Sequence, residues 1–318
     1  MAEGIDEIES GRAALASLLE ALKVRGYRFV TPTPATHARV LARDPGRMAA
    51  SLEDVLGWSR AFRPGSIDAE IETLLREAGA LVSAEGGLKS RLRVSSLGDD
   101  LYLHSAYPTT ERDAVFFGPD SYRFARLVSQ ELTRAPLGHP AHLVDIGAGA
   151  GVGAIVAARS LVLARATLTD INPAALALAR VNAESAGVKV HCSYGPGLAD
   201  LAGTIDLALA NPPFLVDRKN RSYRDGGGMR GGALSVEMAA EALPRLAPGG
   251  RLILYTGSAI ADGRDDLAAA LDALAAKHGC RLAYDEIDPD IFGEELEREA
   301  YREVDRIAAV AAVFRREA

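Results

Sequence analysis

Cysteine is scarce in this sequence: the 318 residues include only Cys192 and Cys280. The two form no close-spaced pair, which argues against a disulfide-stapled fold and a zinc ribbon and favours a reducing cytoplasm. The N-terminus is acidic and has no long apolar run, so neither a signal peptide nor a membrane-spanning helix is expected. His139 and His142 have no cysteine or acidic residue at ligand spacing, so no metal site is expected.

An excess of positive charge is also missing. The formal net charge is −7, so no basic field over the whole protein attracts nucleic acid. Hydrophobic residues make up 48% and charged residues 25% of the chain, as in an ordinary soluble globular protein. The length suits one large domain or, more readily, two.

Residues 1–110 predict a first domain of helices followed by a β-hairpin. Apolar residues at helical spacing predict four helical stretches, near 10–25, 35–43, 48–61 and 66–79. Two alternating segments, 88–96 and 101–107, flank turn residues 97–100 and are typical of a hairpin. This order of elements resembles a winged-helix arrangement, a shape often used on DNA.

The charges of this first domain do not favour DNA reading. Positive and negative side chains nearly cancel over residues 1–110, and the candidate recognition helix is acidic, with Arg76 set against Asp68, Glu70, Glu72 and Glu77. A helix that reads DNA offers cationic and amide side chains to phosphates and bases. We therefore expect a packing or substrate-orienting domain.

Residues 111–318 predict a second domain of the α/β class. A linker over 108–119 leads into this domain, and a helix from Asp120 to about Arg134 is its first element. Strands and helices then alternate, which is the pattern of a parallel sheet with helices on its faces. The expected strands are 142–146, 166–170, 188–192, 205–210, 251–257, 281–287 and 306–315, and the expected helices are 152–164, 173–186, 234–247 and 264–278.

A glycine-rich loop follows the first strand, with Gly147, Gly149 and Gly151 as expected ligand contacts. Such a loop lets the backbone approach a nucleotide-like ligand, but alone it also fits a nicotinamide-linked dehydrogenase. Asp145, at the end of the strand, separates the two readings. A carboxylate is unfavourable beside a pyrophosphate and favourable beside the cationic amino-acid end of S-adenosylmethionine. Its structural alternative is a charge partner of the helix N-terminus.

The next strand ends in Asp170, followed by Ile171, Asn172 and Pro173. A carboxylate there accepts hydrogen bonds from both ribose hydroxyls, a geometry that dinucleotide sites share. Asn172 is a good N-cap and Pro173 a good first helical residue, so those two have a purely structural reading. Asp170 and Ile171 are the expected cofactor contacts.

A further strand stops abruptly at Asn211-Pro212-Pro213-Phe214. Consecutive prolines cannot continue a β-ladder, so this strand presents an amide, a stiff backbone and an aromatic ring at its C-terminal end. In open α/β sheets ligands bind at that edge. By itself the tetrapeptide is either a catalytic site or a rigid strand ending.

DIGAGAG, TDINP and ANPPF, in this order and at this separation, resemble the class I S-adenosylmethionine-dependent methyltransferases. More narrowly, they are similar to the branch that methylates planar nitrogen atoms, which includes release-factor glutamine, ribosomal-RNA guanine and adenine N-methyltransferases. The resemblance covers roughly residues 114–316. It implies S-adenosyl-L-methionine as the cofactor and a Rossmann-like seven-stranded sheet whose last strand is antiparallel, and it leaves the helical, winged-helix-like N-terminal domain outside.

For Asn211, Pro212, Pro213 and Phe214 the resemblance implies a catalytic role. The acceptor nitrogen is a poor nucleophile because its lone pair is delocalised. The Asn211 side-chain oxygen and the Pro212 carbonyl would each accept one of its N–H bonds and favour the positive charge that develops. Phe214 would offer an apolar face to the planar group, and no general base is required before attack.

Two further regions are expected to contact the cofactor. After the third strand the family usually carries an acidic residue that contacts the adenine amine, whereas this chain has Ser193 and Tyr194. We expect the tyrosine ring or a backbone group to meet the adenine. Upstream, Phe117 and Ser121 belong to a segment that resembles the one closing over the methionine end of the cofactor.

The insertion after Phe214, residues 216–232, is the main clue to the substrate. It carries Arg218, Lys219, Arg221, Arg224 and Arg230 in an otherwise acidic protein, and its five glycines predict a mobile flap. Basic side chains interleaved with Tyr223 suit a phosphate backbone with an extruded base, so the first four are the expected substrate-binding residues. The alternative is a solvated loop whose arginines pair with nearby acidic residues.

Three functions remain open. The leading prediction is an N-methyltransferase acting on the amino group of a nucleobase in RNA or DNA. The second is a protein glutamine N-methyltransferase, with the N-terminal helices holding the protein substrate. The third is a non-catalytic binding module, against which the intact Asn211–Phe214 argues.

Overall fold

The computed structural model describes residues 11–198, 201–217, 221 and 223–317. Its internal contacts divide the chain into two compact units. Unit 1 comprises the chain up to Arg123 together with Gly149–Val152 and Pro173–Lys189, and unit 2 comprises Phe124–Ala148, Gly153–Asn172 and Val190–Ala318. A domain boundary near residue 110 stays a prediction.

Unit 1 contains short helices and two β-hairpins. The elements are α2 (Arg12–Val24), α3 (Pro34–Leu41), α4 (Leu52–Leu56), α5 (Ala69–Glu77), β1 (Leu81–Ala84), β2 (Gly87–Ser90), β3 (Leu92–Leu97), β4 (Asp100–Ser105) and α8 (Pro173–Ser185). Thr33, Ser51 and Asp68 cap α3, α4 and α5 by accepting backbone N–H bonds. The expected helix over 48–61 is shorter because Gly57 ends α4 and Ser59 adopts a left-handed φ of 55°.

The hairpin expected over 88–107 is confirmed by β3–β4, and a second hairpin, β1–β2, precedes it. β1 pairs with β2 and β3 pairs with β4, and the expected first strand divides at Arg91. The Arg91 N–H donates to Ala80 and its carbonyl accepts from Ala106, so this residue leaves the ladder. Asn182 of α8 fixes β4 through its side-chain amide, which bonds both the N–H and the carbonyl of Leu103.

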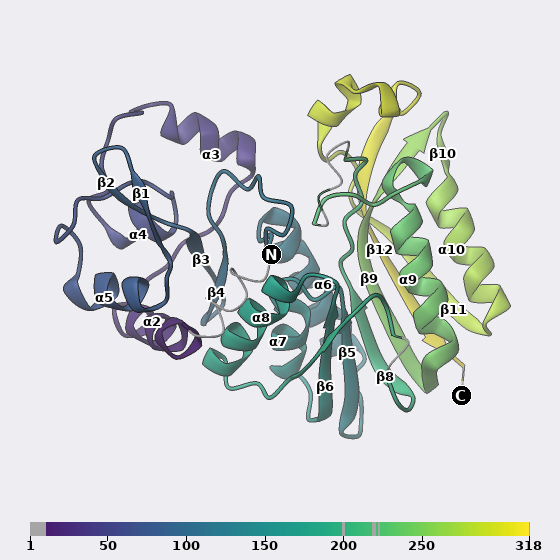
Figure 1. Cartoon of the computed structure of the whole chain (residues 1–318). Helices are drawn as coiled ribbons and strands as arrows, with labels where there is room; N and C mark the ends of the chain where they lie inside the picture. The colour runs from purple at the N-terminus through teal and green to yellow at the C-terminus, as the bar shows by residue number, and fades with distance from the viewer. Residues whose placement is uncertain (1–10, 199–200, 218–220, 222, 318) are drawn as a thin grey trace. The chain divides into compact units, whose positions relative to one another are not determined.

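Unit 2 is built on one twisted sheet (Figure 1). Its strands are β5 (Ala141–Ile146), β6 (Leu163–Asp170), β7 (His191–Tyr194), β8 (Ile205–Ala210), β9 (Leu246–Ala261), β10 (Arg264–Asp265), β11 (Cys280–Asp288) and β12 (Arg306–Arg316). The order is β11-β12-β9-β8-β5-β6-β7, with the short β10 beside β9. Strands β5 to β9 run parallel and β12 is antiparallel to β9 and β11, which confirms the Rossmann-like sheet with an antiparallel last strand.

Helices cover the sheet as βα alternation predicts, with some shifts. They are α6 (Pro119–Arg134), which crosses the boundary between the units, α7 (Val152–Ala158), α9 (Ala233–Ala242) and α10 (Asp266–Lys277), with short 3₁₀ turns at Met229–Gly231, Leu243–Arg245, Gly293–Glu297 and Glu299–Tyr301. The α7 helix is shorter than expected because β6 begins at Leu163. Strand 188–192 is shifted to His191–Tyr194.

The core of unit 2 lies between the sheet and the pair α9 and α10, which cover the same face (Figure 1). Leu243 and Leu271 from the helical side pack with Ile205 and Leu252 from the strands, and all four are fully buried. Within the described residues no helix is long and apolar enough to cross a membrane. Cys192 and Cys280 are both free.

Candidate functional site

Three strand ends meet at one edge of the sheet in unit 2. Ile146 on β5 lies in register with Thr169 on β6 and with Ala210 on β8. Asp145 therefore precedes this level by one residue, while Asp170 and Asn211 follow it by one residue. The three polar residues that the motifs singled out stand side by side at the carboxyl edge, where open α/β sheets bind ligands.

Asp145 is a buried carboxylate without a cation. Its side chain is 2% exposed, and Oδ2 accepts the Ala154 N–H at 2.9 Å. Among the described residues it forms no ion pair. Burial and the nearby charge of Asp170 raise its pKa to about 7 against the opposing hydrogen bond from Ala154. A cationic ligand group would supply the missing charge.

The glycine loop turns directly after Asp145. Gly147 has a φ of 65°, and the Ala148 N–H donates to the Thr169 carbonyl at 3.0 Å, which ties the loop to β6. Gly153 must be small, because a Cβ there would lie 2.7 Å from Asp145 Oδ2. Gly149 and Gly151 belong to unit 1 and are left-handed, and a Cβ on Gly151 would lie 3.2 Å from the Cβ of Ala179 in α8.

Asp170 is flanked by two exposed apolar side chains. Its Oδ1 accepts the Asn172 N–H at 2.8 Å, and its carbonyl accepts the Gly195 N–H at 3.1 Å. Ile171 is 55% exposed, and Tyr194, the register partner of Asp170 on β7, is 67% exposed. Ser193 precedes it and is half-buried. A carboxylate between open apolar surfaces could hold a nucleoside, with the ribose at the carboxylate and the base on the apolar groups.

Phe117 and Ser121 lie in unit 1. The Phe117 ring is fully buried and packs against Tyr102, His104 and Tyr122. Ser121 Oγ accepts the Gly118 N–H at 3.3 Å. Both side chains have structural partners within unit 1, and their contact with the cofactor stays a prediction.

The tetrapeptide Asn211–Phe214, which we call the acceptor segment, follows β8. It carries two oxygen atoms that could accept hydrogen bonds and have no donor among the described residues. Within the described chain, neither the Asn211 side chain nor the Pro212 carbonyl makes a hydrogen bond. Phe214 is only 8% exposed, and its ring lies edge-on to Tyr255 at 6.4 Å and to Phe292 at 5.8 Å between centroids. Most of the Phe214 face is therefore packed within the protein.

Phe292 is an aromatic residue that the sequence analysis missed. It is half-buried, contacts Phe214, and holds a left-handed backbone with a φ of 56°. It comes from the connection between β11 and β12, far from Phe214 in sequence. No local motif marks it; only its contact with the acceptor segment identifies it as a candidate.

Glycines of the insertion pack directly on the acceptor segment. A Cβ on Gly226 would lie 2.7 Å from the Pro213 carbonyl oxygen, and one on Gly231 would lie 2.2 Å from the Phe214 carbonyl oxygen. In β9, a Cβ on Gly257 would lie 2.2 Å from Cδ2 of the Phe214 ring. These positions require glycine for close approach of the backbone, a reason different from the mobility that the glycine content predicts.

The arginines of the insertion are paired with acidic residues. Arg221 donates to both Asp217 oxygens, at 2.7 and 2.9 Å, and this guanidinium holds the pKa of Asp217 well below its usual range. Arg224 pairs with the buried Glu295. Arg218 and Lys219 lie outside the described residues. The two described candidates thus follow the alternative reading, a loop whose arginines pair within the protein.

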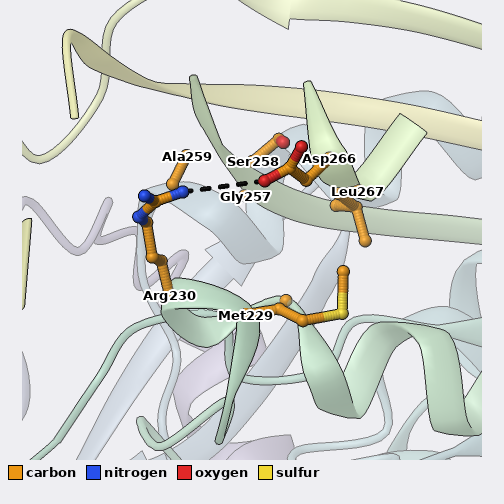
Figure 2. A pocket seen from close by; sticks show the side chains of 8 residues that line it. Met229, Arg230, Gly257, Ser258, Ala259, Asp266 and Leu267 are labelled. Atoms are coloured by element: carbon orange, nitrogen blue, oxygen red, sulfur yellow. Dashed lines mark ion pairs between the residues drawn. The ribbon is translucent and has the colours of Figure 1, made fainter. Parts of the chain in front are cut away.

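A hollow of about 70 Å³ lies beside the insertion (Figure 2). Figure 2 shows Arg230 reaching across it to Asp266, and the closest atoms of this pair are 3.7 Å apart. Met229 and Arg230 both have left-handed φ angles, 54° and 52°. In the part of the chain that the structure describes, no cluster of three or more metal-ligating side chains occurs.

Known proteins resemble this chain in sequence and fold. The family described as methyltransferase small domain matches residues 123–263. A release factor glutamine methyltransferase from Deinococcus radiodurans is 30% identical over 253 residues, which cover 76% of this chain and 84% of that protein. A ribosomal RNA small subunit methyltransferase C from Ectopseudomonas mendocina is 30% identical over 121 residues, 34% of this chain and 36% of that protein.

The fold has a match among solved structures as well. Trm5b from Pyrococcus abyssi superposes with a TM-score of 0.50 over 77% of this chain and 68% of that chain. The identity is 15%, so the likeness concerns the fold alone.

Proposed function

This chain belongs to the class I S-adenosylmethionine-dependent methyltransferases, in the branch that methylates planar nitrogen atoms, and we propose that its acceptor is the side-chain amide of a protein glutamine. The observation that carries N-methylation is the pair of unused acceptors, the Asn211 amide oxygen and the Pro212 carbonyl, at the end of β8. The glutamine is supported by the release factor glutamine methyltransferase that aligns over 84% of its length.

We assign the cofactor contacts by their chemistry. Asp145 would lie beside the ammonium of the amino-acid end, because a buried carboxylate without a cation favours positive charge. Gly147, Gly149 and Gly151 would let the backbone approach the cofactor. Asp170 would accept the ribose hydroxyls, with Ile171 and Tyr194 against the adenine. When bound, S-adenosylmethionine supplies an electrophilic methyl group on a sulfonium.

Asn211 and Pro212 would orient the amide nitrogen. Each oxygen accepts one N–H, which fixes the –NH₂ group and turns its lone pair toward the methyl donor. The same two oxygens stabilise the positive charge that grows on the nitrogen during transfer. The new N–C bond would form as the bond between the methyl group and the sulfonium breaks, and the nitrogen would lose its proton to water afterwards, so no general base has to act first.

The amino group of a nucleobase is the second candidate. Its –NH₂ is also planar, and a ribosomal RNA methyltransferase is among the relatives, although over only 36% of its length. The arginines expected to bind phosphate give this acceptor less support, because Arg221 and Arg224 pair with Asp217 and Glu295.

Labelled cofactor separates the two acceptors. The protein is incubated with tritiated S-adenosylmethionine and with protein, RNA and DNA fractions, and the label is expected in protein, at a glutamine located by mass spectrometry. Label confined to RNA or DNA would refute the glutamine proposal. Asn211→Ala is expected to keep cofactor binding in calorimetry and to lose about 100-fold or more in transfer rate; full activity would remove Asn211 from catalysis.

A further inference from the structure

The hairpin β3–β4 in unit 1 has one polar and one apolar face, and both are buried. Arg93 lies opposite His104 and Ser95 lies opposite Tyr102, so these four side chains share a face. Leu92, Val94 and Leu103 occupy the other face. On the polar face Ser95 Oγ lies 2.7 Å from His104 Nε2 and 2.5 Å from Thr31 Oγ1. The serine and the histidine thus have partners within the fold.

Arg93 on this face has no counter-ion. It is 4% exposed, and its Nε donates to the Ser105 carbonyl at 3.0 Å. Throughout the described chain it has no ion pair and no other hydrogen bond, and its two terminal nitrogens are not sealed from solvent. Burying a guanidinium without an anion costs stability. Elsewhere in unit 1 a buried charge is compensated: Asp54 pairs with Arg47 and lies 3.9 Å from Arg60.

A second cation lies close to Arg93. Lys89 is half-buried and its Nζ donates to the Tyr107 carbonyl at 2.8 Å, two residues beyond the carbonyl that Arg93 uses. Burial and the charge of Arg93 lower the pKa of Lys89, so the two positive charges repel each other. Glu53, the acidic side chain that acts on neighbouring Tyr27, forms no ion pair with either cation.

Aromatic rings and a strained residue surround the same spot. Burial lowers the pKa of His37 to about 4, and its ring centroid lies 4.0 Å from that of Tyr107, on which it stacks, and 5.1 Å from that of Trp58. Ser59 has a left-handed φ of 55°, is 4% exposed, and accepts the Tyr107 N–H at 3.1 Å. Backbone strain of this kind persists at functional sites, where the surrounding structure holds it in place.

We propose that Arg93 and Lys89 form a binding site in unit 1 for the oxyanion group of a ligand, a carboxylate or a phosphate. The planar guanidinium offers two parallel N–H bonds from its solvent-facing end, and the ammonium adds a point charge. The bound anion supplies the counter-charge that the described fold lacks. This site is independent of the acceptor proposed above, because Asn211, Asp145 and Asp170 take no part in it.

Thermal unfolding of the full chain tests the site. Inorganic phosphate or acetate is expected to raise the Tm of the wild type by about 2–4 °C over chloride at equal ionic strength. Arg93→Gln is expected to abolish the rise and Lys89→Gln to reduce it. Arg91→Gln, an exposed arginine two residues away, is the matched control and keeps the rise. Equal rises in wild type and Arg93→Gln would overturn the proposal.

The Tm of Arg93→Gln in chloride is an independent test. A binding role and a purely structural role of Arg93 predict opposite changes in it. Arg93→Gln removes an uncompensated buried charge, so its Tm is expected to equal or exceed that of the wild type. A lower Tm, or a variant that fails to fold, means that Arg93 is paired within the protein and overturns the proposal.

Two nucleosides identify the source of the anion. S-adenosylhomocysteine carries a carboxylate and 5′-methylthioadenosine does not. If Arg93→Gln weakens the first about tenfold or more in calorimetry and leaves the second unchanged, the amino-acid end of the cofactor supplies the carboxylate. If neither changes while the phosphate response still depends on Arg93, the anion comes from a ligand other than the cofactor. Equal loss of both nucleosides reports general damage and refutes the site.

Discussion

Two buried carboxylates of unit 2 behave in opposite ways. Asp145, at the cofactor edge, is 2% exposed, and Asp217, after the acceptor segment, is 4% exposed. Burial and the charge of Asp170 raise the pKa of Asp145 to about 7, whereas Arg221 holds the pKa of Asp217 well below its usual range. Burial alone therefore does not set the charge state: it raises the pKa of Asp145, which has no cationic partner, and at Asp217 the hydrogen bonds from Arg221 outweigh it.

The difference separates the roles of the two regions. At the cofactor edge the buried carboxyl of Asp145 has no cationic partner among the described residues. A ligand would supply the cation, so we expect the charge of Asp145 to depend on the ligand. Around the acceptor segment the arginine charges are paired, and glycines allow backbone to lie on backbone. We interpret the described residues 223–232 of the insertion as a support that fixes Asn211 and Pro212 before the acceptor binds, which is the arrangement that orientation requires.

The largest expected effect comes from breaking the ion pair between Asp217 and Arg221. Asp217→Ala leaves Arg221 without its partner and is expected to lower the free energy of unfolding by about 3 kcal/mol. The value is at the lower end for a buried ion pair because Arg221 keeps some contact with solvent. Urea unfolding measures it. Glu297→Ala, an exposed acid near Glu295, is the control and should change little.

A second substitution disturbs the packing of the insertion on the acceptor segment and leaves the charge of the protein unchanged. Gly231→Ala places a Cβ 2.2 Å from the Phe214 carbonyl oxygen at a φ of 101°, so the acceptor segment has to shift. We expect kcat to fall about 100-fold with cofactor affinity retained. Gly228→Ala is the matched control, because its Cβ would meet no atom closer than 3.8 Å. Equal rates for the two variants would contradict a positioning role.

At the cofactor edge, Asp170→Ala removes the carboxylate proposed to accept hydrogen bonds from the ribose hydroxyls. The affinity for S-adenosylhomocysteine is expected to fall by about 1.5–3 kcal/mol, the value of a hydrogen bond to a charged group. Calorimetry gives the number, and the unfolding free energy of the unliganded protein serves as the check on folding. Unchanged affinity would exclude Asp170 from the site.

The effect expected over a single pH unit is the smallest, and it comes from Asp145. Its pKa is 3.8 in an ordinary carboxyl and about 7 in the folded protein, so the folded state holds a proton that the unfolded chain releases. The stability that this provides is complete below pH 3.8 and is lost as pH rises through about 7. Cofactor affinity, which favours the charged form, is expected to rise over the same range by at most about tenfold per pH unit.

The variant Asp145→Asn isolates this dependence. It is expected to flatten both pH profiles, measured by urea unfolding and by calorimetry, while the exposed Asp272→Asn keeps them. Profiles that stay sloped in Asp145→Asn would assign the titration to another group.

The sequence by itself determined the parallel strands, the glycine loop and the polar residues at three strand ends. These features are local, because hydrophobic periodicity and turn chemistry act over a few residues, and parallel strands bring their carboxyl ends to one edge. It also specified the tetrapeptide whose amide and carbonyl remain unused. The hairpin expected over 88–107 is confirmed in β3–β4, but its first strand was expected to begin too early, since Arg91 forms its backbone bonds outside the ladder.

Only the tertiary structure decided which groups those residues meet. The partner of Arg224 is Glu295, 71 residues further along, and the ring against Phe214 is that of Phe292. The charge state of Asp145 likewise depends on burial and on Asp170 from another strand. Such contacts join segments distant in sequence, and their energies depend on desolvation, which no local pattern encodes. For the same reason Arg93 is an ordinary arginine in the sequence and an uncompensated buried charge in the described fold.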